Sequence, residues 1–411
     1  MDKGYQQTEI GVIPKDWVVK KLAELGKFSK GSGVKKDEAL SGDIPCIRYG
    51  ELYTRHNDYI KQFFSFISNE ISERAKKLKA GDILFAGSGE TKEEIGKSVA
   101  FINSFEAFAG GDIVILSPTS TESLYLGYLL NAPFIRKQKA SRGQGDAVVH
   151  ISANQLGKVI IPLPPTIAEQ TAIATALSDA DHYITHLEQL IAKKRLIKQG
   201  AMQELLKPKE GWVVKKLGDA ASLKARIGWQ GLTTSEYKKD GDFLLITGTE
   251  FQNGFVDWAS CFFVDELRYN QDKNIQVNIS DVLVTKDGTI GKIALIKSLP
   301  KPATLNSGVF VIRPVNKSFN PEFFYYILLS EIFHKFLKQL VAGSTINHLY
   351  QKDFVFFEFL IPESIEEQTR IATILSEMDT ELTILETKLS KAKNIKQGMM
   401  QQLLTGKIRL I

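Results

Sequence analysis

Apolar residues recur at three- and four-residue steps in two long segments, residues 166–207 and 364–411, and this spacing predicts two amphipathic helices. Pro208 and Gly406 are expected to end them. A helix of about 40 residues is roughly 60 Å long, far above the average for globular proteins. Each segment opens with a capping box, in which a hydroxyl and a carboxylate satisfy free amides of the first turn: Thr166–Glu169 and Ser364–Glu367.

The remainder of the chain is also duplicated. Residues 17–22 (WVVKKL) recur unchanged as residues 212–217, and residues 169–171 recur as 367–369. Between these matches the copies diverge, but short apolar runs bounded by Gly, Pro and Asn persist in both and predict strands and turns. The copies therefore share a scaffold, while their loops differ and are expected to serve the same kind of task on different targets.

We therefore predict a mixed α/β (α+β) fold with two globular domains of sheet and helices, residues 1–165 and 208–363. Each domain is followed by one long helix, residues 166–207 or 364–411, so that the chain forms a pseudo-twofold internal repeat. Because a long helix with one apolar stripe needs a partner, we expect the two helices to pair as an antiparallel coiled coil. The alternative is that each helix packs only on its own domain.

Gly200 and Gly398 occupy matching positions inside the two helices, where each costs about 1 kcal/mol relative to Ala. Two explanations stay open: a close approach by a helix or a partner, and a local break in the helix. A run of cations lies nearby, and we interpret it as a solvated polar face, with phosphate contact and partner docking as alternatives. These cations are Lys193, Lys194, Arg195 and Lys198, matched by Lys391, Lys393 and Lys396.

Composition excludes several classes of protein. Hydrophobic residues make up 43% and charged residues 24%, which is ordinary for a globular chain and unlike a disordered or collagen-like one. No apolar run is long enough for a transmembrane helix, and the first residues lack a signal-peptide core. Cys46 and Cys261 are far apart in the sequence, so we expect no disulfide framework and a cytoplasmic location. The net charge of +5 is compatible with nucleic-acid binding without establishing it.

Candidate catalytic motifs fail on inspection. Residues 89–98 resemble a phosphate-binding loop, but Thr91 stands where that motif needs glycine, so a hairpin turn is favoured. His182 and His186 have the spacing of helical metal ligands, but the glutamate of the zinc-protease motif is missing between them. We therefore expect no catalytic residues and no metal site in this chain.

Several segments resemble the specificity subunits of type I restriction-modification systems. The resemblance rests on the opening TEIGVIPKDW at residues 8–17, on the prolines and the Glu-Gln pair that begin each helix, and on IKQG at residues 197–200 and 395–398. It covers essentially the whole chain, including both copies and their order. The second copy departs from the first in its turn, residues 362–364, which lacks the Pro164-Pro165 pair.

This resemblance implies a non-catalytic subunit with two target-recognition domains, each binding one half of a bipartite, asymmetric site in double-stranded DNA. The helices would set the spacing between the halves and dock two modification (methyltransferase) subunits. No cofactor is expected in this chain, because the methyltransferase partners would carry S-adenosylmethionine. Restriction (motor-nuclease) subunits could join the complex, and no membrane partner is implied.

Residues for DNA contact are predicted in basic, glycine-rich or amide-bearing loops. Lys and Arg can neutralise phosphates, while Arg, Gln and Asn make the usual bidentate contacts to bases. In the first domain the candidates are Lys30, Ser32, Lys35, Lys36, Arg48, Tyr49, Ser88, Arg142 and Gln144. In the second they are Lys224, Arg226, Trp229, Gln230, Lys286, Ser344, Thr345, Asn347 and His348. For any single residue, a solvated surface position is the alternative.

Two rival functions remain at this stage. The repeated domains could bind protein, which would make the chain an interaction scaffold without sequence-specific DNA readout. The chain could instead be an enzyme with a cryptic site. Salt-dependent, sequence-selective duplex binding by the assembled complex distinguishes a DNA-binding subunit from the scaffold. Cofactor-dependent methyl transfer by the isolated chain would instead support the enzyme.

Overall fold

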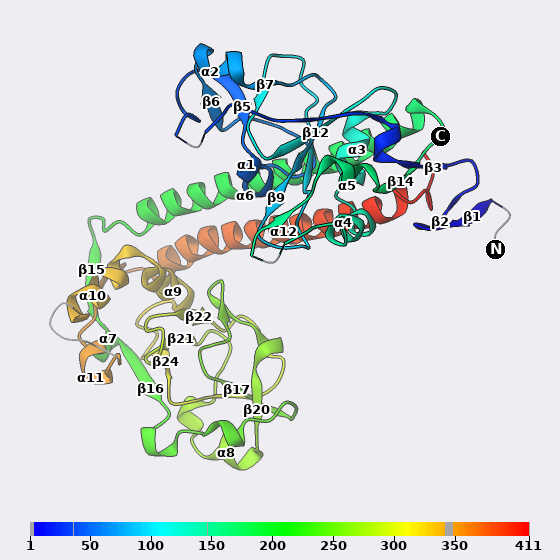
Figure 1. The fold of residues 1–411 in the computed structure, drawn as a ribbon. Coiled ribbons are helices and arrows are strands. Elements are labelled where there is room, and N and C mark those ends of the chain that lie inside the picture. The colour runs from blue at the N-terminus through cyan, green and yellow to red at the C-terminus, as the bar shows by residue number, and fades with distance from the viewer. Residues whose placement is uncertain (1–3, 36, 146, 342–347, 411) are drawn as a thin grey trace. The chain divides into compact units, whose positions relative to one another are not determined.

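The computed structural model describes residues 4–35, 37–145, 147–341 and 348–410, and within them the chain divides into two compact units. Unit 1 comprises Met1–Gln189 and Thr387–Ile411, and unit 2 comprises Leu190–Glu386. Figure 1 colours the chain by residue number and labels a part of the elements of both units. Each of the two long helices, α6 (Ile167–Leu205) and α12 (Ile365–Leu403), contributes one segment to each unit.

The main sheet of each unit has four antiparallel strands in the same order. In unit 1 that order is β10 (Ser98–Ala100), β8 (Ile83–Ala86), β12 (Ile113–Pro118) and β4 (Gly26–Lys30). In unit 2 it is β22 (Ile293–Leu295), β21 (Val282–Thr285), β24 (Val309–Pro314) and β16 (Ala221–Ala225). The apolar runs that the sequence matched weakly are therefore equivalent strands, and they are fully buried along most of their length.

A second, mixed sheet is repeated as well. In unit 1 its order is β6 (Ser65–Ile67), β5 (Ile44–Ile47), β11 (Phe108–Ala109) and β7 (Lys76–Lys77), with β5 and β11 parallel. In unit 2 it is β20 (Phe262–Val264), β17 (Phe243–Ile246) and β23 (Ala303–Leu305), with β17 and β23 parallel. The duplication thus extends to strand direction, which the diverged sequences did not reveal.

The identical WVVKKL segments lie at equivalent places in small two-stranded sheets. β3 (Val18–Lys21) pairs antiparallel with β14 (Ile160–Leu163), and β15 (Trp212–Lys216) pairs with β25 (Glu358–Pro362). The remaining strand pairs are β1 (Tyr5–Thr8) with β2 (Gly11–Pro14), β9 (Ser88–Gly89) with β13 (Val149–His150), and β18 (Phe251–Gln252) with β19 (Phe255–Val256).

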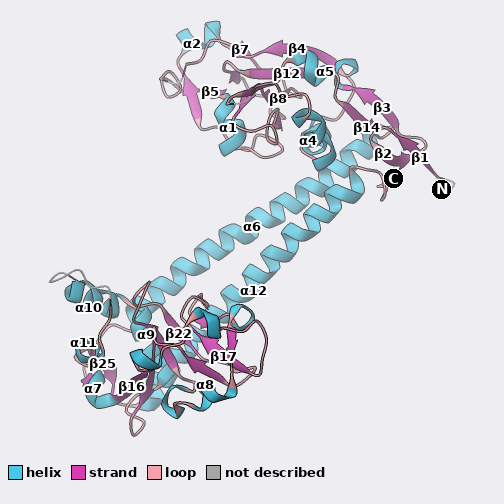
Figure 2. Ribbon diagram, turned by 60° about the horizontal axis from the view of Figure 1, so that its bottom comes forward, coloured by secondary structure: helices cyan, strands magenta, loops and turns pink. Residues whose placement is uncertain are grey.

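Short helices complete both units, and Figure 2 distinguishes them from the strands by colour. Unit 1 has α1 (Tyr49–Thr54), α2 (Asn69–Arg74), α3 (Ser123–Leu129), α4 (Pro133–Ala140) and α5 (Ala153–Gly157). Unit 2 has α7 (Leu217–Ala220), α8 (Glu266–Asn270), α9 (Pro321–Leu329), α10 (Glu331–Val341) and α11 (Gln351–Phe354).

At the start of both long helices the hydroxyl half of the predicted capping box is confirmed, but among the described residues neither the Glu169 nor the Glu367 carboxylate accepts from the cap amide, and that of Glu169 binds Arg409 instead. The Glu169 amide donates to Thr166 Oγ1 at 3.2 Å, and the Glu367 amide donates to Ser364 Oγ at 3.2 Å. The helices end at Leu205 and Leu403, each three residues before the expected terminator. Both run without interruption through their glycines, so the predicted alternative of a local break is wrong.

Within each unit, the end of one long helix packs beside the start of the other. Ile173, Ala174 and Leu177 of α6 share a buried cluster with Leu403 and Leu404 in unit 1. Unit 2 repeats this packing with Ile371, Ala372 and Leu375 of α12 beside Leu206. Each buried Leu or Ile contributes about 1.5–3 kcal/mol, so each helix start is anchored by its own domain and by the other helix together.

Ion pairs within each unit give the relative direction of the two helices. In unit 2, Lys194 pairs with Glu381 at 2.6 Å and Lys198 pairs with Asp379, so the α12 partner moves backward as α6 advances. In unit 1, Glu188 pairs with Lys393 at 2.7 Å and Asp181 with Lys396 at 2.8 Å. These segments are therefore antiparallel inside each unit.

The interpretation of the helix cations as a solvated polar face is wrong for two of them. The side chains of Lys198 and Lys396 are only 17% and 16% exposed, and both bind carboxylates. The sequence did not reveal this, because an ion pair across two helices depends on their register. Lys193 and Lys391 are exposed, as expected.

Candidate nucleic-acid interface

Two neighbouring pockets of unit 1 collect five of the predicted DNA-contacting residues. Arg48 and Tyr49, at the start of α1, line one pocket of about 720 Å³. Lys30, Ser88 and Gln144 line the other, which has about 790 Å³. Both pockets are lined by Asp112, so loops that are far apart in the sequence face one region of this unit.

Internal hydrogen bonds hold the first pocket in shape. Arg48 Nε donates to Ser65 Oγ at 3.0 Å, and its amide donates to Glu51 Oε2 at 3.1 Å. The Ser65 hydroxyl donates to the buried Glu51 carboxylate. The guanidinium is half-buried and anchored through Nε, so it is placed by the fold before any ligand arrives.

Other predicted residues of unit 1 lie outside these pockets or serve the fold. The Ser32 hydroxyl donates to Arg74 O at 3.2 Å, and the Lys35 amide donates to Glu38 Oε2 at 2.8 Å, while the Lys35 side chain is exposed. Arg142 Nη1 donates to Gln138 O at 2.8 Å. Lys36 lies outside the described residues. The DNA contacts of all these residues remain predictions.

The predicted residues of unit 2 differ in their surroundings. Lys224 is exposed on β16, whereas Lys286 Nζ lies 5.4 Å from the centre of the Phe310 ring. His348 is exposed and its Nδ1 contacts Asp287 Oδ1. Gln230 is half-buried, and its Oε1 has no hydrogen-bond partner among the described residues. Ser344, Thr345, Asn347 and the side chain of Trp229 lie outside what the structure describes.

Arg226 departs from its prediction as a DNA-contacting residue. It is 1% exposed, and its guanidinium donates to Leu305 O at 2.8 Å and to Gln271 Oε1 at 2.9 Å. Burial lowers the pKa of this guanidinium from its ordinary value. A buried guanidinium that donates to internal acceptors cannot reach a phosphate unless the surrounding structure unfolds. Arg226 therefore has a structural role. In the sequence it was indistinguishable from an exposed loop arginine.

The sequence also missed a repeated polar network. In unit 1, Tyr128 donates to Asp181 Oδ2 at 2.7 Å, and Lys396 binds the same carboxylate. In unit 2, Tyr326 donates to Asp379 Oδ2 at 2.8 Å, and Lys198 binds that carboxylate. All three pairs of equivalent residues are 198 positions apart, so a closer comparison of the two copies would have found them.

This network ties the globular domain of each unit to both long helices. The tyrosine comes from α3 or α9, the aspartate from the helix that follows that domain, and the lysine from the other helix. Burial, followed by the neighbouring aspartate, raises the pKa of both tyrosines, so each hydroxyl keeps its hydrogen and donates it. The domains are thereby fixed on the helices by directional contacts as well as by apolar packing.

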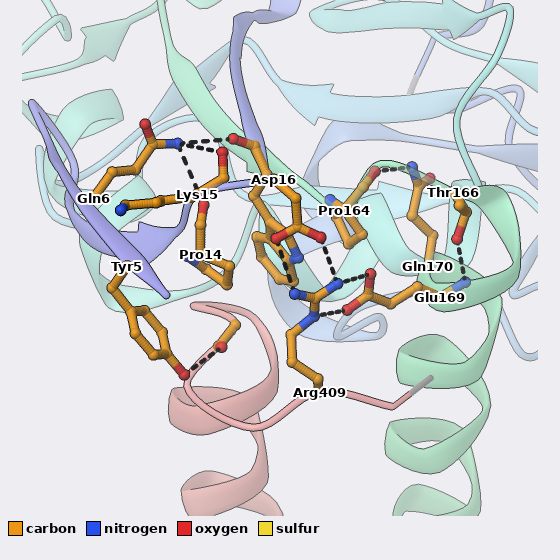
Figure 3. A network of polar contacts seen from close by, with 12 residues as sticks. Tyr5, Gln6, Pro14, Lys15, Asp16, Pro164, Thr166, Glu169, Gln170 and Arg409 are labelled. Carbon is orange, nitrogen blue, oxygen red and sulfur yellow. Dashed lines mark hydrogen bonds and ion pairs between the residues drawn. The ribbon is translucent and has the colours of Figure 1, made fainter. Parts of the chain in front are cut away.

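Unit 1 has a further clasp near its N-terminal hairpin, shown in Figure 3. Arg409 binds the buried carboxylate of Glu169, at the start of α6, and donates to both oxygens of Asp16 at 3.0 and 2.9 Å. Tyr5 of β1 donates to Lys407 O at 3.2 Å. Residues close to the two ends of the chain are thus joined at the start of α6.

The described residues hold no group of three or more His, Cys, Asp or Glu that could bind a metal ion. None of their helices combines the length and apolarity that crossing a bilayer requires.

Comparison with known proteins assigns the family. The model of the type I restriction modification DNA specificity domain matches residues 14–198 and again residues 209–394. The chain belongs to this family, and it contains the domain twice.

Relatives match along nearly their full length. The chain is 27% identical to a putative type I restriction enzyme MjaX specificity subunit of Methanocaldococcus jannaschii, over 100% of this chain and 97% of the relative. It is 22% identical to the EcoKI specificity subunit of Escherichia coli, over 97% and 90% of the two chains. The crystal structure of a type I restriction-modification S subunit from M. genitalium has a similar fold, with a TM-score of 0.63, 16% identity, and 94% and 96% coverage.

Proposed function

We propose that this chain is the specificity subunit of a type I restriction-modification complex, and that each unit binds one half of a bipartite DNA site. The observation that carries the proposal is the twofold match to the DNA specificity domain, on two units with the same strand order. Two copies of one scaffold with different loops can bind two different half-sites, so the site need not be palindromic.

The pockets of unit 1 supply the chemistry for such a task. Lys30 and Arg48 are cations for phosphates or guanine, and Gln144 carries an amide suited to adenine. Backbone contacts position a protein on the duplex, whereas contacts to base edges select the sequence. We therefore assign both the backbone contacts and the base contacts to these two pockets of unit 1.

The two long helices would set the distance between the half-sites and bind two methyltransferase subunits. Gly200 and Gly398 support docking, because nothing lies within 4 Å of a Cβ built on either. The packing of this chain therefore does not require the glycines, although each costs about 1 kcal/mol in a helix. Ile197 and Ile395, three residues earlier, are 46% and 52% exposed. A partner helix could approach the backbone closely at Gly200 or Gly398 and cover the exposed isoleucine beside it.

Catalysis would reside in the partners. The methyltransferase subunits would bring S-adenosylmethionine, and restriction subunits could join to form a nuclease. This chain would supply the choice of sequence, and its two equivalent helix surfaces fit two copies of one partner.

The decisive experiment maps methylated adenines in random-sequence DNA treated with the assembled complex. A bipartite, asymmetric motif with a fixed gap is expected, together with binding that falls steeply as salt increases. A short continuous palindrome, or equal affinity for all duplexes, would refute the proposal. Equal affinity for all duplexes is the result expected of a protein-interaction scaffold.

A further inference from the structure

One histidine is repeated at the same structural position in both units. His150 lies in β13, where it pairs antiparallel with Ser88 of β9. His348, 198 residues later, forms an isolated antiparallel bridge with Asp287. Ser88 and Asp287 are themselves equivalent, because each stands two residues after the matching strand, β8 or β21. The fold therefore places an imidazole beside the same turn twice.

The side chain beside the imidazole differs between the units. Ser88 Oγ lies 2.9 Å from His150 Nδ1, whereas Asp287 Oδ1 contacts His348 Nδ1. An ionised carboxylate only accepts hydrogen bonds, so His348 carries a hydrogen on Nδ1. A hydroxyl can donate or accept, so the Ser88 contact allows either tautomer of His150. Which nitrogen of a histidine carries hydrogen is set by the partner of the other nitrogen.

Both imidazoles can be reached by a ligand. His150 and His348 are exposed, and no described residue hydrogen-bonds to Nε2 of either ring. His150 and Ser88 line the 790 Å³ pocket together with Lys30, Gln144, Gln155 and Lys158. The pocket also contains one carboxylate, that of Asp112, but its cations and amides beside the imidazole match the phosphates and base edges of DNA better than they match an apolar ligand.

We propose that His150 and His348 are equivalent base-contacting residues of the two units, and that Ser88 and Asp287 decide what each Nε2 presents to DNA. The proposal rests on the DNA-binding function given above. In the neutral form of His348, the Nδ1 contact with Asp287 makes Nε2 an acceptor, which fits the amino group of adenine or cytosine in the major groove. Held by Ser88, His150 presents Nε2 as a donor or an acceptor, and it can also contact guanine N7 or thymine O4.

The test maps methylation by the assembled complex on random-sequence DNA, for the wild type and for single variants. His150→Asn and His348→Asn retain a polar group near the Nδ1 position but remove Nε2. Each is expected to lower discrimination at one base pair of its own half-site about tenfold or more, and to leave the other half unchanged. Exchange of the partners, Ser88→Asp and Asp287→Ser, is expected to change the preferred base at that same position.

Matched controls replace exposed histidines elsewhere in each unit. His182→Asn on α6 and His334→Asn on α10 should leave both half-sites as in the wild type. Melting temperature and copurification with the methyltransferase identify any variant that fails to fold, and the partner exchange then tests the same position independently.

Wild-type base preferences in both asparagine variants and in both partner exchanges would overturn the inference while the proposed function stands. If the wild-type complex marks no bipartite site, the proposed function itself fails, and the inference fails with it. The two failures are therefore distinguishable from the wild-type map alone.

Discussion

Asp82 of unit 1 and Asp281 of unit 2 occupy the same position, immediately before β8 or β21, and both are buried. Each accepts a backbone hydrogen bond, from Lys79 at 2.8 Å and from Asn278 at 2.7 Å. Their second partners differ. In unit 1 the hydroxyl of Ser117 donates to Asp82 at 2.6 Å, whereas in unit 2 Arg313 forms a two-pronged ion pair with Asp281 at 2.7 and 2.6 Å.

The two units therefore keep a buried, hydrogen-bonded aspartate at the same position, but they bind it with different side chains. A buried carboxylate must be satisfied, because an unpaired charge in the interior costs several kcal/mol. A hydroxyl and a guanidinium both meet that need, at matching positions on β12 and β24.

The largest expected effect comes from removing the guanidinium. Arg313→Ala should destabilise unit 2 by about 4 kcal/mol, because it leaves the Asp281 charge buried without its cation. Ser117→Ala should cost unit 1 only about 1–2 kcal/mol, the value of a buried hydrogen bond. Urea unfolding of the two variants, followed by hydrogen exchange in each unit, compares them. Equal losses would show that the two partners are energetically equivalent.

A second comparison concerns the lysines of the helix network. Lys396 binds both Asp58, at 3.2 Å, and Asp181, whereas Lys198 binds only Asp379 among the described carboxylates. Lys396→Met should therefore destabilise its unit by about 3 kcal/mol, and Lys198→Met by less.

The effect of Lys396→Met on stability should also depend on pH. Burial raises the pKa of Asp58 above its ordinary 3.8, although Lys396 opposes the shift. A carboxyl with a raised pKa contributes stability below its unfolded pKa and loses it as pH rises through the folded pKa. Removing Lys396 raises that folded pKa further, so the variant should lose more stability than the wild type between acid and neutral pH. Parallel curves for the two proteins, measured by denaturant unfolding, would contradict this account.

The clasp made by Arg409 should have a smaller effect, confined to unit 1. The equivalent position in the first copy is Gly211, which has no side chain with which to form such a contact. Arg409→Ala should release the hairpin of β1 and β2, with a loss of about 2 kcal/mol seen as faster hydrogen exchange there. Exchange in unit 2 is the internal control and should not change.

This clasp should also open in acid. The hydrogen bond from Arg409 lowers the pKa of Asp16 below its ordinary 3.8, so its contribution is present above that value and disappears as pH falls through the folded pKa. In the Arg409→Ala variant, exchange in residues 5–17 should lose this acid dependence. An unchanged acid dependence would assign the effect to other groups.

The smallest expected effect comes from replacing the helix glycines, which should change stability and partner binding in opposite directions. Gly200→Ala and Gly398→Ala should each stabilise the chain by about 1 kcal/mol, because the added methyl group meets open space and alanine favours the helix. Both variants should nevertheless bind the methyltransferase more weakly than the wild type, as measured by titration calorimetry. A stabilised variant with unchanged affinity would remove these positions from the proposed docking surface.

Much of the architecture could be predicted from the sequence. The long helices follow from apolar spacing and from hydroxyls at their starts, which are local signals that burial on one face then reinforces. The order of the two copies follows from identical segments. The two compact units divide both long helices, so they do not correspond to the four predicted domains. The boundaries of those domains therefore remain a prediction.

The site was less predictable, because the residue types that contact DNA are also those that make hydrogen bonds inside the protein. Arg226 and Arg48 both look like loop arginines, yet one is buried on backbone carbonyls and the other lines a pocket. His150 escaped notice because a single histidine carries no periodic signal. Only its place opposite Ser88 gives it a partner.

Taken alone, the order of residues determined the duplication, the two helices and the kinship with specificity subunits, since these depend on patterns along the chain. The tertiary structure decided which charges are buried, which lysine meets which aspartate, and which histidine has a free nitrogen. Those outcomes depend on the distance between atoms that are far apart in sequence, and strand pairing and helix register set that distance.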